Sequence, residues 1–347
     1  MNLEAMIETT RALTARGKGI LAADESHGTI GKRFAAIGVE NTAENHRQYR
    51  QLLFMTPGVA EILSGVILYD ETIRQKADDE TPFPQLLVRL GIVPGIKVDA
   101  GAKPLAGAPD EMVTEGLDGL RERLAEYRSL GARFAKWRAV IQIGEGRPSR
   151  YCLEANAHAL GRYAALCQEA DLVPIVEPEV LMDGSHTIEQ CFDATQAALD
   201  TLFRSLRDQR LVLEALLLKP NMVVAGAKCP RQAGVEEVAE ATVRCLRRTV
   251  PAAVPGVMFL SGGQTPEHAT QHLNAMNMLP GPRPWALSFS FARALQQPAM
   301  DAWRGSPAAV QAAQQAFLRR ARLVSAAREG RYTPAMEQAA AAGPGRR

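Results

Sequence analysis

Eight short apolar runs recur along the chain, and a longer amphipathic stretch separates each run from the next. The runs lie at residues 19–26, 65–71, 94–101, 133–140, 172–179, 214–221, 256–264 and 285–293. Apolar residues in the intervening stretches recur every three or four positions, which is typical of helices packed on one side. Strands that alternate with helices build a parallel sheet, and eight such units can close into a barrel. The sequence therefore predicts an α/β fold, a (β/α)₈ TIM barrel.

One barrel of this kind accounts for nearly all of the 347 residues. A chain of this length could hold two domains, but barrels commonly use such a length as one. We therefore predict a single domain over residues 1–334. Residues 335–347 end in AAAAGPGRR, a sequence of small residues that cannot form a packed core, so we predict a flexible, low-complexity tail there.

Charge and cysteine content limit the partners and the compartment. With 40 basic and 38 acidic residues the net charge is only +2, so no broad positive field favours nucleic acid or a membrane surface. The start of the chain has no apolar core of signal-peptide length, and no stretch reaches the roughly 18 apolar residues of a membrane span. The five cysteines are odd in number and include no Cys-x-x-Cys pair, which indicates a reducing compartment. We expect a cytoplasmic protein that binds neither nucleic acid nor membrane.

Polar side chains gather toward the carboxyl ends of six of the eight runs. In a barrel these ends meet on one face, where the active sites of this fold lie. Several of the residues form pairs two positions apart, so both members of a pair point the same way along a strand. A single pair such as Lys97 and Asp99 could be a structural salt bridge, but unpaired buried charges are costly, so six polar strand ends, five of them charged, favour a functional site. The residues are Asp24, Lys97, Asp99, Lys136, Arg138, Glu177, Glu179, Lys219 and Ser261.

Lys219 follows a run of leucines and precedes a proline, in the sequence EALLLKPN. The conservative interpretation is a lysine at a strand end whose amine reaches solvent. A lysine among apolar residues and other charges can instead attack a ketone or aldehyde to form a Schiff base. That reaction needs an acid to expel water, for which Glu177 is suitably placed, and the imine then stabilises a carbanion at the neighbouring carbon. Asp24 could accept the hydroxyl proton whose loss drives carbon–carbon cleavage.

The segment FLSGGQTPEH after the seventh run predicts a phosphate-binding site. The amides of residues 261–263 lead directly into a helix whose start has Thr265 as a cap and Pro266 in the first turn. Taken alone, Ser-Gly-Gly could be only a turn. Loops after the seventh and eighth strands of such barrels frequently bind phosphate, however, and the eighth run ends in Ser290 and Arg293.

Together these segments resemble the class I fructose-bisphosphate aldolases, which are lysine-dependent enzymes of glycolysis and gluconeogenesis. The resemblance rests on motifs that include GKGILAADES, GIKVDAG, FAKWR, VPIVEPE, LLLKPNMV and GVMFLSGGQ, and it runs in order from about residue 3 to residue 334. It implies reversible cleavage of fructose 1,6-bisphosphate to dihydroxyacetone phosphate and glyceraldehyde 3-phosphate through a lysine Schiff base. It also implies a sugar phosphate as the small-molecule partner, a homotetramer and no cofactor.

The resemblance also assigns roles to individual residues. It implies the Schiff base on Lys219, acid–base catalysis on Glu177, and further catalytic roles for Asp24, Lys136 and Glu179. Substrate or phosphate binding is implied for Arg33, Lys97, Arg138, Ser261, Gly262, Gly263, Ser290 and Arg293. No metal ligands are implied.

Some positions depart from the family pattern. Ala215 and Ala292 stand where the family usually has glycine, which matters only where the backbone needs a positive φ or a very close approach to phosphate. The tail lacks the C-terminal tyrosine that many relatives have.

His268 and His272 lie four residues apart on a predicted helix, but they have no third ligand, so we expect a solvated helix face rather than a metal site.

Two other functions remain open at this point. One is another Schiff-base lyase acting on sugar phosphates, which would share the lysine but not two separate phosphate sites. The other is a non-catalytic scaffold with a retained site. Loss of Lys219, Glu177 or Asp24 would favour the scaffold, and all three residues are present.

Overall fold

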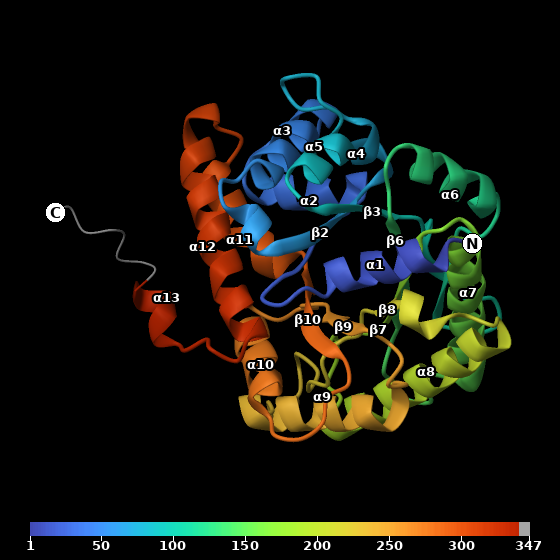
Figure 1. The fold of residues 1–347 in the computed structure, drawn as a ribbon. Helices are drawn as coiled ribbons and strands as arrows, with labels where there is room; N and C mark the ends of the chain where they lie inside the picture. Colours follow the sequence, from blue (N-terminus) through green and yellow to red (C-terminus); the bar gives the residue numbers. More distant parts are fainter. Residues whose placement is uncertain (340–347) are drawn as a thin grey trace.

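In the computed structural model, which describes residues 1–339, eight parallel strands close into a barrel (Figure 1). Around the barrel the strands follow the order β1-β10-β9-β8-β7-β6-β3-β2. The predicted (β/α)₈ TIM barrel is therefore confirmed. The strands are β1 (Gly19–Ala23), β2 (Leu63–Leu68), β3 (Val93–Lys97), β6 (Phe134–Ile141), β7 (Val173–Val180), β8 (Leu217–Leu218), β9 (Gly256–Phe259) and β10 (Ala286–Phe291).

Helices follow the strands and form an outer layer around the barrel (Figure 1). Helix α8 (Ile188–Asp208) shows why such segments are helical, since Thr187 and Gln190 form a capping box at its start and its buried residues recur on one face. The other helices of this layer are α2 (His27–Ala36), α3 (Ala43–Phe54), α4 (Asp70–Arg74), α5 (Phe83–Arg89), α6 (Leu120–Ser129), α7 (Arg150–Glu169), α9 (Val235–Thr249), α10 (Pro266–Met278), α11 (Arg293–Trp303) and α12 (Val310–Arg328). Single 3₁₀ turns occur at η1 (Val59–Glu61), η2 (Leu213–Ala215) and η3 (Pro307–Ala309).

Two local features differ from the sequence-based expectation. The strand expected within residues 214–221 is reduced to β8, because η2 precedes it and Pro220 has no amide hydrogen with which to extend the ladder. Between β3 and α6 the chain also forms an antiparallel hairpin of β4 (Gly101–Pro104) and β5 (Met112–Glu115). The sequence analysis missed this hairpin, whose strands are only four residues each and whose first strand contains glycine and proline.

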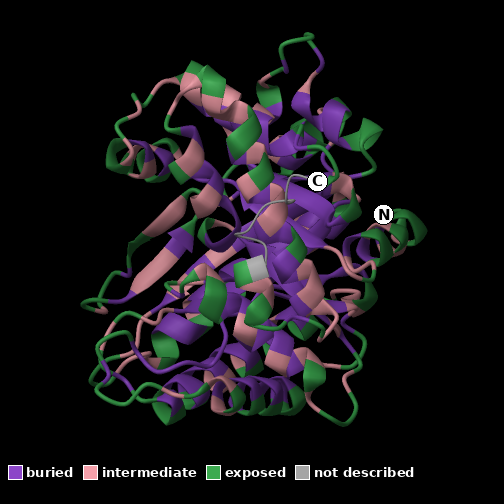
Figure 2. Cartoon of the chain, turned by 90° about the vertical axis from the view of Figure 1, so that its left-hand side faces the viewer, coloured by how far each residue is buried: buried purple, intermediate pink, exposed green. Residues whose placement is uncertain are grey.

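Two apolar clusters stabilise the barrel, and buried residues fill its centre (Figure 2). The larger cluster lies between the strands and the helices and includes Trp137, Phe259 and Phe291. The smaller cluster consists of apolar side chains that six of the barrel strands direct inward, and α1 (Leu3–Leu13) runs across the barrel and adds Met6 and Leu13 to it (Figure 1). Its buried members are Met6, Leu13, Ile20, Ala22, Ile67, Phe134, Val173, Ile175, Ala215, Leu217 and Met258. The amino-terminal end of the barrel is therefore filled with side chains.

The described chain ends in a short helix, α13 (Ala335–Ala339), which occupies the first part of the predicted tail. The carboxylate of Glu337 accepts hydrogen bonds from Arg320 at 2.8 Å and from the Tyr332 hydroxyl at 3.0 Å. Residues 340–347 lie outside the described part of the chain, so the domain boundary at residue 334 stays a prediction. None of the helices within residues 1–339 is both long and apolar enough to span a bilayer.

Candidate active site

A cavity of about 580 Å³ opens at the carboxyl ends of the barrel strands. It lies opposite the end that α1 covers. Every residue that the sequence analysis assigned to the site lines this cavity: Asp24, Arg33, Lys97, Lys136, Arg138, Glu177, Glu179, Lys219, Ser261, Gly262, Gly263, Ser290 and Arg293. The structure therefore brings together residues that come from all parts of the sequence.

The two-residue period of the strands gathers the charged side chains. On β6, Phe134 belongs to the inner apolar cluster, and Lys136 and Arg138 follow at steps of two residues. On β7, Ile175 occupies the inner cluster and Glu177 comes two residues later. The two strands pair in parallel with Arg138 opposite Glu177, so the cations of one strand lie beside the carboxylates of the next.

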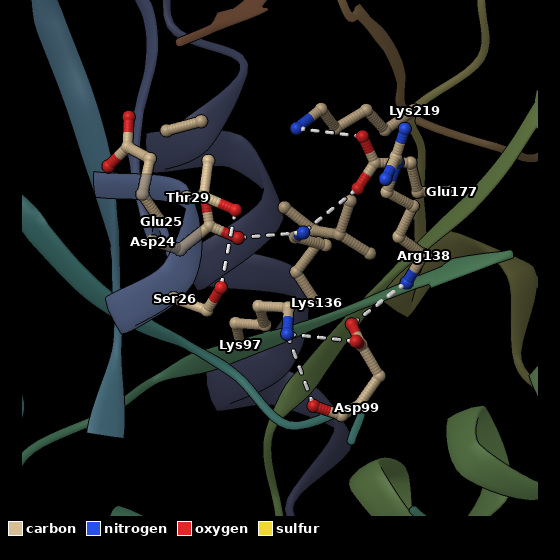
Figure 3. A network of polar contacts seen from close by, with 12 residues as sticks. Asp24, Glu25, Ser26, Thr29, Lys97, Asp99, Lys136, Arg138, Glu177 and Lys219 are labelled. Carbon is tan, nitrogen blue, oxygen red and sulfur yellow. Dashed lines mark hydrogen bonds and ion pairs between the residues drawn. The ribbon is translucent and has the colours of Figure 1, made fainter. Parts of the chain in front are cut away.

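Four buried side chains form a row of alternating charge at the centre of the cavity (Figure 3). The Nζ atom of Lys219 lies 3.1 Å from Glu177 Oε1. The other carboxylate oxygen, Glu177 Oε2, lies 3.1 Å from Lys136 Nζ, which in turn is 2.7 Å from Asp24 Oδ2. Glu177 thus lies between the two lysine amines, where a carboxyl group could exchange a proton with either.

The charges of this row fix the protonation state of three of its members. Burial alone would raise the pKa of Asp24, but the ammonium groups of Lys136 and Lys219 outweigh burial and hold that pKa well below its ordinary value. Burial would likewise raise the pKa of Glu177, but the ammonium groups of Lys136 and Lys219 outweigh it and lower that pKa. Burial would lower the pKa of Lys136, but Asp24 and Glu177 raise it above its ordinary value. At neutral pH both carboxylates are ionised and Lys136 is protonated.

A second charged group lies beside this row. Lys97 Nζ is 2.9 Å from Asp99 Oδ1, so the salt bridge considered from the sequence is present. The same carboxylate accepts a hydrogen bond from the backbone amide of Arg138 at 3.2 Å, and the Arg138 guanidinium donates to Glu179. Lys97 still lines the cavity, so its pairing with Asp99 and contact with a ligand are compatible.

Glu25 is a residue of the cavity that the sequence analysis did not assign. It accepts a hydrogen bond from Arg33 Nη1 at 2.5 Å and one from Gln296 Nε2 at 2.7 Å. Its other oxygen lies 2.6 Å from Arg50 Nη2, and the side chain is buried. Strand periodicity would point Glu25 away from its neighbour Asp24, but β1 ends before both residues, so both line the cavity.

The predicted phosphate loop has the expected form. Gly262 has a φ of +56°, a left-handed conformation that glycine adopts readily. Thr265 caps α10 by accepting a hydrogen bond from the amide of His268 at 3.2 Å, and Pro266 occupies the first turn as predicted. Among the described residues, the buried hydroxyl of Ser290 has no hydrogen-bond partner. That hydroxyl and the start of α10 offer donors for an anion.

Met182 was also missed, and it contacts the same loop. The amide of Gly263 donates a hydrogen bond to the Met182 sulfur at 3.1 Å. A thioether is a weak acceptor, so this contact keeps the amide partnered without holding it strongly. An incoming phosphate oxygen would have to displace the sulfur.

The expectation of a solvated helix face for His268 and His272 is wrong for His272. That ring is buried, and its Nδ1 atom lies 2.6 Å from Gln264 Oε1. Because Gln264 Nε2 donates to the carbonyl of Ser261, its Oε1 must accept a hydrogen bond from the neutral imidazole. Burial lowers the pKa of His272 to about 4. His272 therefore supports the phosphate loop from behind.

The two alanines that replace family glycines create no backbone conflict. Ala292 lines the cavity with a φ of −103°, and Ala215 lies buried in η2. Neither has a left-handed conformation. The conformational reason for glycine is therefore absent at both positions.

The fold and the site define the class of protein. A (β/α)₈ barrel with two buried lysines on either side of a carboxylate, next to a loop of available hydrogen-bond donors, is an enzyme scaffold suited to Schiff-base chemistry on a phosphorylated carbonyl compound.

Comparisons with known proteins agree with this class and make it specific. Residues 5–344 match the family described as fructose-bisphosphate aldolase class-I. A probable fructose-bisphosphate aldolase class 1 of Xanthomonas axonopodis pv. citri is 60% identical, over 87% of this chain and 90% of the relative. Cytosolic fructose-bisphosphate aldolase 6 of Arabidopsis thaliana is 53% identical, over 95% and 92%. The structure of fructose-bisphosphate aldolase from Plasmodium falciparum superposes with a TM-score of 0.93 at 48% identity, covering 95% of each chain. The chain belongs to the class I fructose-bisphosphate aldolase family and is an aldehyde-lyase.

Proposed function

We propose that Lys219 is the residue of this class I aldolase that forms the Schiff base with fructose 1,6-bisphosphate. The observation that carries the proposal is the buried amine of Lys219, 3.1 Å from Glu177 Oε1 at the end of an apolar strand. Cleavage then yields dihydroxyacetone phosphate and glyceraldehyde 3-phosphate, and the reverse reaction condenses them. This is the reaction of the family in glycolysis and gluconeogenesis.

Formation of the imine requires two proton transfers, which we assign to Glu177. The neutral amine of Lys219 forms a bond to the carbonyl carbon while the carbonyl oxygen takes up a proton. The resulting hydroxyl group leaves as water after a second protonation, and the nitrogen lone pair closes the carbon–nitrogen double bond. The Glu177 carboxylate contacts the lysine amine directly, so it can take each of the two protons from the lysine nitrogen and pass it to the departing oxygen, which leaves Glu177 ionised again at the end.

Carbon–carbon cleavage needs a base for the hydroxyl proton on the fourth carbon, and we assign Asp24 to it. As that proton leaves, the bond between the third and fourth carbons breaks and its electrons move to the iminium nitrogen. Asp24 is a weak base while Lys136 stabilises its charge. We therefore assign Lys136 to positioning both carboxylates, and we expect its contact with Asp24 to weaken when substrate binds. Glu179 holds the Arg138 side chain.

Recognition of a bisphosphate requires two basic regions. We assign one phosphate to the loop donors of residues 261–263 with Ser290 and Arg293. The second phosphate and the sugar hydroxyls are assigned to Arg33, Lys97 and Arg138 on the other side of the cavity. Substrates with one phosphate would leave one of these regions unused, which distinguishes this function from other Schiff-base lyases.

A coupled assay tests the proposal directly. Turnover of fructose 1,6-bisphosphate should exceed that of fructose 1-phosphate in kcat/KM, and the Lys219→Met variant should lose both activities. Equal kcat/KM for the two sugars would remove the second phosphate from the proposal. Undiminished activity in Lys219→Met would remove the Schiff base from this residue.

We also propose that the enzyme is a cytoplasmic homotetramer. The compartment is supported by the Arabidopsis relatives named cytosolic and by the five buried, unpaired cysteines. Light scattering during size exclusion should give about four times the chain mass of 37.6 kDa. A mass equal to one or two chains would contradict the tetramer.

A further inference from the structure

We propose that His27, His46 and Glu71 form a binding site for one divalent transition-metal ion, separate from the catalytic lysine. The Nε2 atom of His27 lies 2.7 Å from Glu71 Oε2, and the Nδ1 atom of His46 lies 2.8 Å from Glu71 Oε1. One donor atom from each residue lies within 4.8 Å of the other two. The residues come from α2, α3 and α4, so the site joins three helices.

The hydrogen-bond partners of His46 direct its other nitrogen at Glu71. Its Nε2 atom lies 2.7 Å from the amide oxygen of Asn41, which can only accept, so Nε2 donates its hydrogen there. The Nδ1 atom faces Glu71 Oε1 at 2.8 Å. His46 is 4% exposed, so these two atoms are shielded from water and can hold one cation between them.

The ligand set matches a known type of metal site. Two imidazoles and one carboxylate leave a fourth position open for water in tetrahedral zinc sites. Ligating histidines usually donate their second N–H to a carbonyl or carboxylate oxygen, which is the contact that His46 makes with Asn41. Imidazole ligands suit Zn²⁺, Co²⁺ or Ni²⁺ better than Mg²⁺ or Ca²⁺. The His27 side chain is 57% exposed and gives the ion a path of entry.

The present geometry is close to that of a loaded site. Metal–ligand distances of about 2.0–2.2 Å in a tetrahedron separate the ligand atoms by roughly 3.3 Å. The two nitrogen–oxygen distances here are 2.7 and 2.8 Å. The three donor atoms lie within 4.8 Å of one another, so loading requires the short contacts to lengthen by less than about 1 Å and the more distant donors to approach by at most roughly 1.5 Å.

Sequence spacing could not reveal this site. Glu71 lies 44 residues from His27 and 25 residues from His46, so no short motif contains the ligands. The only histidine pair with helical spacing, His268 and His272, has one ring bound to Gln264. The sequence analysis expected no metal ligands, so the proposed site goes beyond that expectation at a position outside the catalytic chemistry.

A bound ion would act on the loop beside the cavity. Ser26 lies directly before α2, and Thr29 lies in the first turn of that helix. Both residues line the cavity. A metal held by His27 would fix this turn against α3 and α4. The site is thus placed to set the position of the loop without touching Lys219.

Equilibrium dialysis of the full chain against Co²⁺ or Zn²⁺, followed by elemental analysis, tests the proposal. We expect about one ion per chain at low micromolar concentration, and at least tenfold weaker binding in His27→Ala. His27 is half exposed, so this variant should fold, which circular dichroism checks. His158→Ala, which removes an exposed histidine on α7, is the matched control and should bind like the wild type.

A second measurement uses stability. Zn²⁺ should raise the melting temperature of the wild type and of His158→Ala, but not of His27→Ala or Glu71→Gln, because only a protein that binds the ion gains from it. The proposal is overturned if the wild type retains no ion at about 100 μM. It is equally overturned if His27→Ala and Glu71→Gln bind the ion as tightly as the wild type does.

Discussion

The two ends of the barrel interior are built from the same strand faces and have opposite chemistry. On β7, Val173 and Ile175 lie in the inner apolar cluster, and Glu177 and Glu179 follow on the same face. Three other strands repeat the pattern, with Phe134 before Lys136 on β6, Leu217 before Lys219 on β8, and Ile20 and Ala22 before Asp24 after β1. The change from apolar to charged takes one two-residue step.

Because of this difference, the amino-terminal end of the barrel serves mainly the stability of the fold, and the carboxyl-terminal end serves mainly its function. The amino-terminal end gains from apolar burial and from the cover that α1 provides. The carboxyl-terminal end buries ionic groups that are tolerated only because they pair with one another. Substitutions at the first end should therefore change the free energy of unfolding, and substitutions at the second should change catalysis.

The pair Glu177→Gln and Ile175→Val tests this separation within one strand, and its first member has the largest expected effect. Glu177→Gln should lower kcat by roughly 10²- to 10⁴-fold, because a positioned acid–base group contributes about that much. Ile175→Val should leave kcat unchanged and cost roughly 0.5–1.5 kcal/mol of stability. Steady-state kinetics and urea denaturation of both variants measure the two effects. A normal kcat in Glu177→Gln would move the acid–base role to Glu179 or Asp24.

Phe134→Ala probes the apolar end and should have a large effect on stability. The ring fills the space above Gly95, where an added Cβ would collide with it, and it also packs near Gly65. Its removal should cost about 3–5 kcal/mol of unfolding free energy. The fraction of enzyme that remains folded should keep a kcat within about twofold of the wild type. A selective loss of kcat would show that the two ends are not independent.

The pH dependence of stability should arise at the charged end, and His272 is the clearest case. Its pKa is lowered to about 4, so between pH 6.5 and pH 4 the unfolded chain binds its proton more tightly than the folded chain. The contribution of His272 to the free energy of unfolding is fully present above pH 6.5 and is lost as the pH falls toward 4. Its full size is roughly 3 kcal/mol. His272→Gln should flatten the stability profile in this window, as measured by denaturation at several pH values. An unchanged profile would contradict the assignment.

Met182→Ala has the smallest expected effect. It removes the sulfur that accepts from the Gly263 amide, so a phosphate no longer has to displace it. A net hydrogen bond contributes about 0.5–1.5 kcal/mol, so KM for fructose 1,6-bisphosphate should fall by roughly two- to tenfold with little change in kcat. Met182→Leu, which keeps the bulk without the acceptor, separates the contact from the space it fills. A higher KM in both variants would mean that Met182 supports the loop rather than competes with phosphate.

The sequence predicts those parts of the molecule that depend on local periodicity. The period of two along β6 and β7 predicts which side chains face the interior, and strand order predicts the phosphate loop after β9. Glu25 and Met182 could not be found this way, because their roles depend on where a strand ends and on a contact between two loops. The same holds for His272, whose burial depends on Gln264 folding back onto α10.

Trapping of the imine tests the central claim most directly. Borohydride added together with dihydroxyacetone phosphate should inactivate the enzyme and attach one reduced triose phosphate per chain, since reduction of the imine leaves a stable secondary amine on the lysine. Mass spectrometry of the digested protein should locate the adduct on Lys219, and Lys219→Met should remain unlabelled. An adduct on Lys136 or Lys97, or inactivation without any adduct, would contradict the account.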